Sequence, residues 1–202
     1  TIAKRIARRL GYIYVDTGAM YRAMAYYLIQ NQVDAADQEA IAAACQHADI
    51  SICYQDGEQV VLLNGENVNA YLRTEAVGNM ASVSSVVPEV RKKLVELQQK
   101  LARETDVVMD GRDIGTVVLP DADVKVYLTA SVETRAKRRF LELQEKGESA
   151  DLAKIAADIE DRDYRDMHRD ISPLRQAEDA TLVDSSDMTI DQVVERILEL
   201  CR

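Results

Sequence analysis

The chain is poor in the residues on which several classes of protein depend. It has only three cysteines and two histidines among 202 residues. The cysteines form no CxxC pair and have no suitably spaced histidine partners, so neither a disulfide framework nor a zinc site is expected. Neither histidine has a triad partner in the sequence, which argues against histidine catalysis. Reduced thiols are typical of a cytoplasmic protein, and we expect that location.

Positive charge and long apolar runs are scarce as well. The formal net charge is −10, which disfavours a general nucleic-acid surface. No apolar run approaches the length of a transmembrane helix and no signal-peptide pattern is present, so we expect no membrane association. The apolar fraction of 47% is ample for a core, and the length fits one domain with a small insert.

A phosphate-binding loop is the most consequential absence. Residues 1–10 carry apolar side chains at helical spacing, and Gly11 is expected to end that helix. A strand at 12–15 and a helix at about 19–30 follow. Because right-handed β-α-β units place a strand before the helix, we infer a strand and a loop ahead of Thr1. No GxxxxGK[ST] sequence occurs in the chain, although the start of such a helix is where a phosphate would bind.

The periodicity changes in the middle of the chain. A helix at 37–48 precedes two runs, 51–54 and 59–63, which Asp56-Gly57 joins as a predicted β-hairpin. We interpret residues 50–88 as an antiparallel insert inside an otherwise β-α-β chain. The other expected elements are a second turn at Asn64-Gly65, a weak helix at 69–85, helices at 88–104, 131–144, 151–169 and 187–201, and a strand at 181–184.

The stretch 107–128 combines two short apolar runs with the polar bend 110–113. Two buried parallel strands around a functional loop have this pattern. Ligands of open α/β sheets bind beyond the carboxyl ends of the strands, so the bend is a candidate site. Asp110 stands where P-loop enzymes carry their metal-associated acid. A buried structural ion pair is the alternative for the charged residues of this bend.

A second strand end carries Asp16-Thr17-Gly18, with Tyr21 and Arg22 one helical turn later. An acid at this place can orient a nucleophile or a metal-bound water, and Arg22 is close enough in sequence to share its ligand. The alternative is a helix N-cap formed by Asp16 or Thr17.

Three arginines and an aspartate share one face of the helix at 151–169. They are Arg162, Arg165, Asp166 and Arg169. This face suits a clamp for phosphate and sugar, because the guanidinium fork matches phosphate oxygens. A solvated face with i,i+4 ion pairs is the alternative.

A second arginine cluster occupies the helix at 131–144. Its members are Arg135, Arg138 and Arg139. The cluster precedes a polar break with a glycine at 146–149, an order that suits a lid closing over phosphates. An ordinary solvated helix surface is the alternative.

Four motifs together resemble those of bacterial cytidylate kinases. They are YVDTGAMYR at 14–22, DGRDIGTVV at 110–118, LQEKG at 143–147 and RDYRD at 162–166. The resemblance runs over the whole chain and implies a P-loop NTPase fold of the α/β class, a three-layer α/β/α arrangement with a parallel core sheet. The implied reaction transfers the ATP γ-phosphoryl to CMP or dCMP with Mg²⁺, in pyrimidine nucleotide metabolism. The implied domains are a kinase core at 1–49 and 89–202, an NMP-binding insert at 50–88 and an arginine-bearing lid at about 138–152.

The resemblance also implies roles for individual residues. The acceptor site would be lined by Asp16, Thr17, Tyr21 and Arg22. The cytosine edge or the CMP phosphate would meet Thr17, Arg91, Arg112 and Asp113. The sugar would be held by Ser82, Arg162 and Asp166. The phosphates in transit would be neutralised by Arg135, Arg139, Arg165 and Arg169. Asp110 would act on the metal through water, and Thr1 would lie on the ATP side.

The resemblance places the phosphate-binding loop of the family directly before Thr1. We therefore expect a protein made of these 202 residues alone to be catalytically inactive and to fold poorly. We expect the parent protein to be active and to fold well. Two alternatives stay open from the sequence, a kinase for another small acceptor such as UMP and a nucleotide-binding module without catalysis. The expected partners are ATP and CMP or dCMP, without nucleic acid or membrane, and a monomer is expected.

Overall fold

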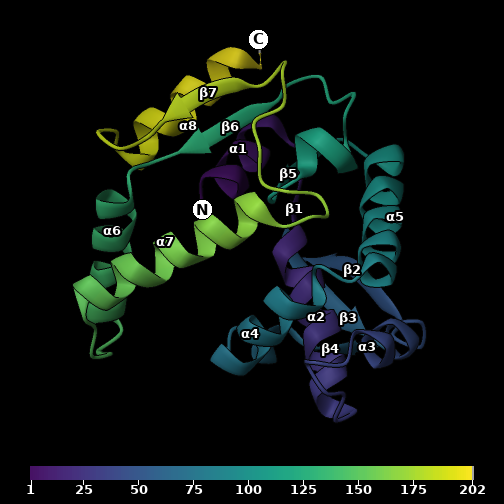
Figure 1. The fold of residues 1–202 in the computed structure, drawn as a ribbon. Helices are drawn as coiled ribbons and strands as arrows, with labels where there is room; N and C mark the ends of the chain where they lie inside the picture. Colours follow the sequence, from purple (N-terminus) through teal and green to yellow (C-terminus); the bar gives the residue numbers. More distant parts are fainter. Residues whose placement is uncertain (202) are drawn as a thin grey trace. The chain divides into compact units, whose positions relative to one another are not determined.

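The computed structural model describes residues 1–201 and shows a mixed α/β protein (Figure 1). The chain divides into two compact units, one from Ala3 to Ile114 and one from Gly115 onward. We call them the first unit, to which Thr1 also belongs, and the second unit.

The helices and strands follow one another in mixed order along the chain. They are α1 (Ile2–Leu10), β1 (Ile13–Asp16), α2 (Thr17–Gln30), α3 (Gln38–Cys45), β2 (Ile50–Gln55), β3 (Glu58–Leu63), β4 (Glu66–Asn67), the 3₁₀ turn η1 (Asn69–Tyr71), α4 (Glu75–Ser84), α5 (Pro88–Glu104), β5 (Val107–Asp110), the π-helical turn η2 (Ile114–Val118), β6 (Val126–Thr129), α6 (Val132–Glu145), α7 (Leu152–His168), β7 (Thr181–Asp184) and α8 (Ile190–Leu200).

A parallel pair of strands, β1 and β5, supports the first unit. The register places Asp16 opposite Asp110, so two carboxylates meet at the carboxyl ends of the strands. Helix α1 leads into β1 and ends at Gly11, whose φ of 74° lies in the left-handed region that favours glycine. The predicted end of the first helix is confirmed.

Helix α2 lies at the centre of the core of the first unit. Met20, Met24 and Leu28 are fully buried, and the helix packs against α4, β3 and α3. The prediction of a helix at about 19–30 is confirmed, but α2 begins earlier, at Thr17. The carboxylate of Asp16 accepts a hydrogen bond from the Ala19 backbone N–H and so satisfies a free donor of the first turn.

The predicted hairpin is confirmed as β2 and β3, paired from Ile50–Leu63 at one end to Gln55–Glu58 at the other. Its two turn residues, Asp56 and Gly57, have φ values of 52° and 76°. Two consecutive left-handed residues are what a tight two-residue hairpin turn requires. The short strand β4 adds to β3 after the second predicted turn. Residues 50–88 hold this sheet, η1 and α4.

The second unit contains another parallel pair, β6 and β7, with Val126 opposite Thr181. Helices α6 and α7 pack against each other. Helix α8 begins with a capping box, in which the Thr189 side chain accepts from the Gln192 N–H and the Gln192 side chain accepts from the Thr189 N–H. This cap explains why α8 begins at Ile190 rather than at the predicted residue 187.

The stretch 107–128 forms two strands as predicted, but they are less buried than expected. Strand β5 pairs in parallel with β1, and β6 pairs in parallel with β7. The strands are mostly half-buried, and Leu128 is 43% exposed. The strand that we inferred ahead of Thr1 stays a prediction.

Candidate active site

The ends of β1 and β5 form the densest group of predicted site residues in the first unit. We call Tyr14, Asp16, Thr17, Arg22 and Asp110 the strand-end cluster. The Asp16 carboxylate caps α2 through one oxygen, and its other oxygen accepts from Arg22 Nη2 at 3.0 Å. The alternative of an N-cap is thus observed, and the same carboxylate also holds the arginine one helical turn later.

Arg22 retains a donor that no other described residue uses. Its Nε is buried and has no hydrogen-bond acceptor among residues 1–201. A buried unpaired donor costs free energy, of order 1–3 kcal/mol, unless a ligand or water accepts from it. Gly18 makes the close approach possible, because a Cβ there would lie 3.0 Å from Arg22 Nη1. The arrangement fits an anionic ligand.

The surroundings of Asp110 disfavour the ionised form of its carboxyl group. Burial raises the pKa of the Asp110 carboxyl, and repulsion from Asp16 raises this pKa further. The Tyr14 hydroxyl lies 3.2 Å from each Asp110 carboxylate oxygen. Burial, followed by the nearby Asp110 charge, raises the pKa of Tyr14 far above its usual range. A cation or a positively charged ligand group would relieve the repulsion between the two carboxylates.

Thr17 ties the two strand ends together. It is buried, and its hydroxyl donates to the Asp110 backbone oxygen at 2.7 Å. Gly111 allows this contact, since a Cβ at that position would lie 2.6 Å from Thr17 Oγ1. The motif glycine after Asp110 is therefore required by a close approach.

Arg91 and Asp113 form an ion pair that is almost fully buried, with 6% and 7% of the two side chains exposed. Arg91 Nη1 also donates to the Ser85 carbonyl at 3.1 Å, and the guanidinium lies 5.6 Å from the centre of the Tyr21 ring. The buried ion pair that was the alternative interpretation of this bend is thus present. Asp113 of the bend pairs with Arg91 of α5.

Three other predicted residues of the first unit lie near its surface. Arg112 is exposed, and its charge lowers the pKa of Asp110. Thr1 is exposed, and its side chain makes no cap hydrogen bond for α1. Ser82 is exposed on α4, and its carbonyl accepts from the Ser85 hydroxyl.

In the second unit, Arg135 and Arg139 of α6 are paired with acidic side chains, whereas Arg138 donates to the carbonyls of Ser185 and Met188. Arg135 contacts both carboxylate oxygens of Asp163, at 3.0 and 2.5 Å, and donates to the Ala130 carbonyl. Arg139 lies 2.9 Å from Glu142. Hydrogen bonds from Lys146, followed by Arg139, lower the pKa of Glu142 to about 2.

The predicted face of α7 contains the ion pair that was its alternative interpretation. Arg162 Nε lies 3.9 Å from Asp166, and 65% of the Arg162 side chain is exposed. Arg165 donates to the Asp161 carbonyl at 3.3 Å, and Arg169 Nε donates to the Ser172 carbonyl at 2.7 Å. The phosphate and sugar clamp on this face stays a prediction.

Sequence reasoning missed several polar partners of the predicted residues. Tyr14 and Asp163 lie in the motifs at 14–22 and 162–166, but the sequence predicts no role for them, and it predicts none for Tyr54 or Gln59. The alternation along β1 places Tyr14 on the same face as Asp16, which was a usable signal. Gln59 and Tyr54 carry no local signal, because their partners on β1 are 43 and 40 residues away in sequence.

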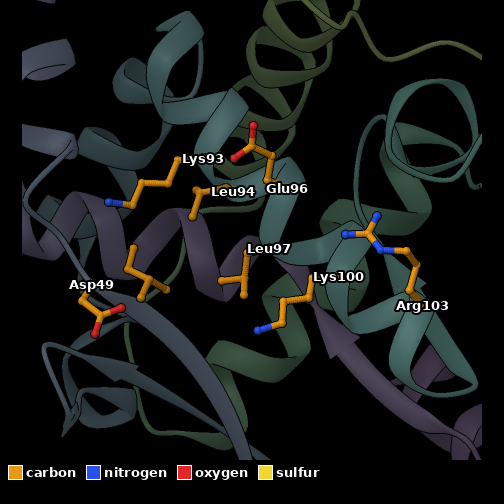
Figure 2. A pocket seen from close by; sticks show the side chains of 8 residues that line it. Asp49, Lys93, Leu94, Glu96, Leu97, Lys100 and Arg103 are labelled. Atoms are coloured by element: carbon orange, nitrogen blue, oxygen red, sulfur yellow. The ribbon is translucent and has the colours of Figure 1, made fainter.

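One cavity of about 460 Å³ lies on the first unit (Figure 2). Residues of α5, among them Lys93, Leu97 and Lys100, line it together with Asp49 and Ile50 at the start of β2. None of the predicted site residues lines this cavity. It is therefore separate from the strand-end cluster.

Two properties of residues 1–201 bear on membranes and metal ions. No helix in that range is long and apolar enough to cross a membrane. No group of three or more His, Cys, Asp or Glu side chains in that range could hold a metal ion by itself. A divalent ion at Asp110 would therefore keep much of its coordination from water and substrate, as Mg²⁺ commonly does.

The parallel strand pairs, the acids at their ends and the arginine-bearing helices belong to the P-loop type of α/β nucleotide kinase. The family model described as Cytidylate kinase matches residues 1–202. The cytidylate kinase of Lactobacillus johnsonii is 52% identical over 200 residues, which make up 99% of this chain and 87% of that protein. That of Caldicellulosiruptor saccharolyticus is 48% identical over 200 residues (99% and 88%), and that of Bacillus licheniformis 45% over 201 residues (99% and 89%). The chain belongs to the cytidylate kinase family.

Proposed function

We propose that this protein transfers the γ-phosphoryl group of ATP to CMP or dCMP and so forms CDP or dCDP in pyrimidine nucleotide metabolism. Membership of the family supports the reaction. The observation that carries it is the strand-end cluster, in which Asp16 holds Arg22 while the buried Arg22 Nε has no acceptor among residues 1–201. A donor prepared in this way suits the phosphate or sugar of an acceptor nucleotide.

The proposal assigns roles to individual residues. Asp16, Thr17, Tyr21 and Arg22 line the acceptor site, and Arg91, Arg112 and Asp113 with Thr17 meet the cytosine edge or the CMP phosphate. Ser82, Arg162 and Asp166 hold the sugar. Arg135, Arg139, Arg165 and Arg169 neutralise the phosphates in transit, and Thr1 lies on the ATP side. The proposed domains are the core at 1–49 and 89–202, the NMP-binding insert at 50–88 and the lid at about 138–152.

Phosphoryl transfer needs little covalent help from a protein, because positioning and charge neutralisation lower most of the barrier. The acceptor is a phosphate oxygen that is largely ionised at neutral pH, so no strong general base is needed. Arginines keep their charge at any physiological pH. In our proposal, Arg135 and Arg139 exchange their acidic partners for phosphate oxygens when nucleotides bind.

Asp110 is the residue proposed to act on Mg²⁺, through water. The donor set fits, because the Asp110 and Asp16 carboxylates repel each other at neighbouring strand ends. Mg²⁺ held there would supply positive charge that offsets the charge of the phosphate oxygens. We further propose that the protein is a cytoplasmic monomer, and its three cysteines are free thiols in the structure.

A coupled assay of the full gene product with ATP and a panel of CMP, dCMP, UMP and AMP tests the reaction. We expect CMP and dCMP to be the best acceptors. A clear preference for UMP would replace the proposed substrate, and binding of nucleotides without turnover of any acceptor would replace the proposed activity. A protein made of the 202 residues alone should be inactive in the same assay, because these residues contain no GxxxxGK[ST] sequence.

A further inference from the structure

Strand β1 has a second edge that no strand covers among residues 1–201, where β5 is its only strand partner. The Ile13 N–H donates toward the β5 side, to the Asp106 carbonyl at 3.0 Å. Backbone groups alternate in direction along a strand, so the N–H and C=O groups of Tyr14 and Asp16 face the other edge. These groups need other partners when they are shielded from water.

Two side chains of the β2–β3 hairpin supply the partners. The Gln59 side chain accepts from the Asp16 N–H through Oε1 at 2.8 Å and donates to the Asp16 carbonyl through Nε2 at 3.2 Å. The Tyr54 hydroxyl donates to the Tyr14 carbonyl at 3.1 Å. Tyr54 and Gln59 stand opposite each other in the hairpin register, so both side chains leave from the same face. One primary amide therefore makes the two hydrogen bonds that a neighbouring strand would make to Asp16.

The backbone that Gln59 holds belongs to the residue on which the acceptor side of the cluster depends. Asp16 caps α2 through one carboxylate oxygen and holds Arg22 through the other. Small shifts of a binding group weaken binding, because its hydrogen bonds to the ligand lose their geometry. The position of Asp16 therefore sets the positions of the α2 N-terminus and the Arg22 guanidinium together.

We propose that Gln59 is a positioning residue for the acceptor nucleotide. Its amide fixes the backbone of Asp16 and, through Asp16, the donors of Arg22. This inference rests on the proposed function, in which Asp16 and Arg22 meet the acceptor. Gln59 acts from the hairpin and makes no contact with the substrate. Asp110, proposed for the metal side, lies on β5, whereas both hydrogen bonds of the Gln59 amide go to the Asp16 backbone on β1. The effect of Gln59 therefore falls on the acceptor rather than on ATP.

The test is a Gln59→Met variant of the full gene product, because methionine has a similar length and lacks the amide. Losing two hydrogen bonds of ordinary net strength predicts a rise of about five- to tenfold in the KM for CMP. The KM for ATP should stay within about twofold of the wild-type value. Gln59→Glu is the second variant. It loses the donor and sets an oxygen against the Asp16 carbonyl, so its CMP KM should rise at least as much.

Gln55→Met is the matched control, since Gln55 is an exposed glutamine on the same hairpin and stands opposite Glu58 rather than Tyr54. Its CMP KM should equal that of the wild type. Circular dichroism and the thermal midpoint establish that each variant is folded before its kinetics are compared. A folded Gln59→Met protein with a wild-type CMP KM would overturn the proposal. Equal rises in the KM for CMP and for ATP would overturn it as well, because a purely structural role moves both.

The two proposals fail in different ways. If the wild-type protein does not phosphorylate CMP or dCMP, the proposed function fails whatever Gln59 does. If the wild type phosphorylates CMP and both Gln59 variants bind CMP as the wild type does, only the positioning role fails. Calorimetric titration of CMP gives the same comparison without turnover, and the dissociation constant should rise by the same factor as the KM.

Discussion

Arg91 of the first unit and two arginines of α6 in the second unit are placed in opposite ways. In the first unit, Arg91 is buried, and its carboxylate partner Asp113 is buried with it. In the second unit, 34% of the Arg135 side chain is exposed and 48% of that of Arg139, and both face acids on the surfaces of α6 and α7. A buried pair has a fixed geometry, because breaking it leaves an unpaired charge in the protein interior. An exposed pair contributes about 0–1 kcal/mol and changes partners at little cost.

This difference suggests that the fixed pair and the exchangeable pairs have different roles in the proposed reaction. A fixed pair suits recognition of a base or a bound phosphate, which needs donors and acceptors at constant positions. Exchangeable pairs suit phosphates whose charge moves during transfer. Asp163 and Glu142 then act as substitutes for phosphate, keeping Arg135 and Arg139 oriented. Four substitutions test this contrast.

Removing the buried arginine should have the largest effect. Arg91→Met leaves the Asp113 carboxylate buried without its partner, and we expect the free energy of unfolding to fall by about 3–5 kcal/mol. Urea denaturation followed by circular dichroism measures the change. Arg103→Met, at an exposed arginine of the same helix, is the control and should have little effect. A loss below about 1 kcal/mol for Arg91→Met would erase the contrast between the units.

Removing an arginine of the second unit should affect the rate and not the fold. Arg169→Ala is expected to lower kcat by about 10²–10³, as the loss of a preorganised donor does, while the thermal midpoint changes little. Arg196→Ala, at an arginine of α8 that pairs with Glu199 on the surface, is the control. Near wild-type turnover of Arg169→Ala would remove α7 from the proposed site.

A neutral contact of the first unit gives an intermediate effect with a pH signature. Tyr54→Phe removes the hydrogen bond to the Tyr14 carbonyl and should cost about 1 kcal/mol at neutral pH. Burial raises the pKa of Tyr54 from 10.0 to about 12. Between these values the unfolded chain loses the phenol proton before the folded protein does, so wild-type stability falls as the pH rises.

The phenylalanine variant has no such proton to lose. The stability difference between wild type and Tyr54→Phe should therefore shrink as the pH rises from 10 toward 12. Urea denaturation of both proteins at neutral pH and within this window measures it. A difference that is constant over the window would show that Tyr54 titrates normally.

The smallest effect is expected for Glu142→Gln in the second unit. Glu142 pairs with Arg139 and Lys146, but about half of its side chain is exposed. Solvent screens such pairs, so we expect a stability change of less than about 0.5 kcal/mol, despite the lowered pKa of Glu142. Thermal denaturation at low and high salt measures it. A large, salt-insensitive loss would mean that the pairs of this unit are as fixed as Arg91–Asp113.

Local rules predicted most elements of the fold but not their partners. The hairpin followed from Asp56-Gly57, the start of α5 from Pro88 and the end of α1 from Gly11, because turn and cap preferences depend on neighbouring residues. The pairing of β5 with β1 and of β6 with β7 was not foreseen, since strand pairing depends on contacts that are remote in sequence.

The candidate site shows the same limit. Motifs indicated Asp16, Arg22 and Asp110, and the structure places them together in the strand-end cluster. The sequence indicated an ion pair in the bend but not that Arg91 is the partner of Asp113. It did not indicate the partner of Arg135, because Asp163 lies 28 residues farther along the chain. Side-chain pairing of this kind depends on how helices pack, which local periodicity does not specify.

The two-residue turn at Asp56 and Gly57 has a consequence for how this family of sequences can vary. Tyr54 and Gln59 reach β1 from the same face of the hairpin because the turn that joins their strands has only two residues. Side chains alternate along a strand, so one inserted residue beyond the turn would reverse the face of every following side chain of β3 unless a bulge absorbed it. The number of residues in the turn is therefore constrained more strongly than their identity. Other residues that adopt left-handed backbone angles can replace Asp56 and Gly57, but a residue cannot be added. Natural relatives that keep the glutamine should therefore keep the loop at two residues.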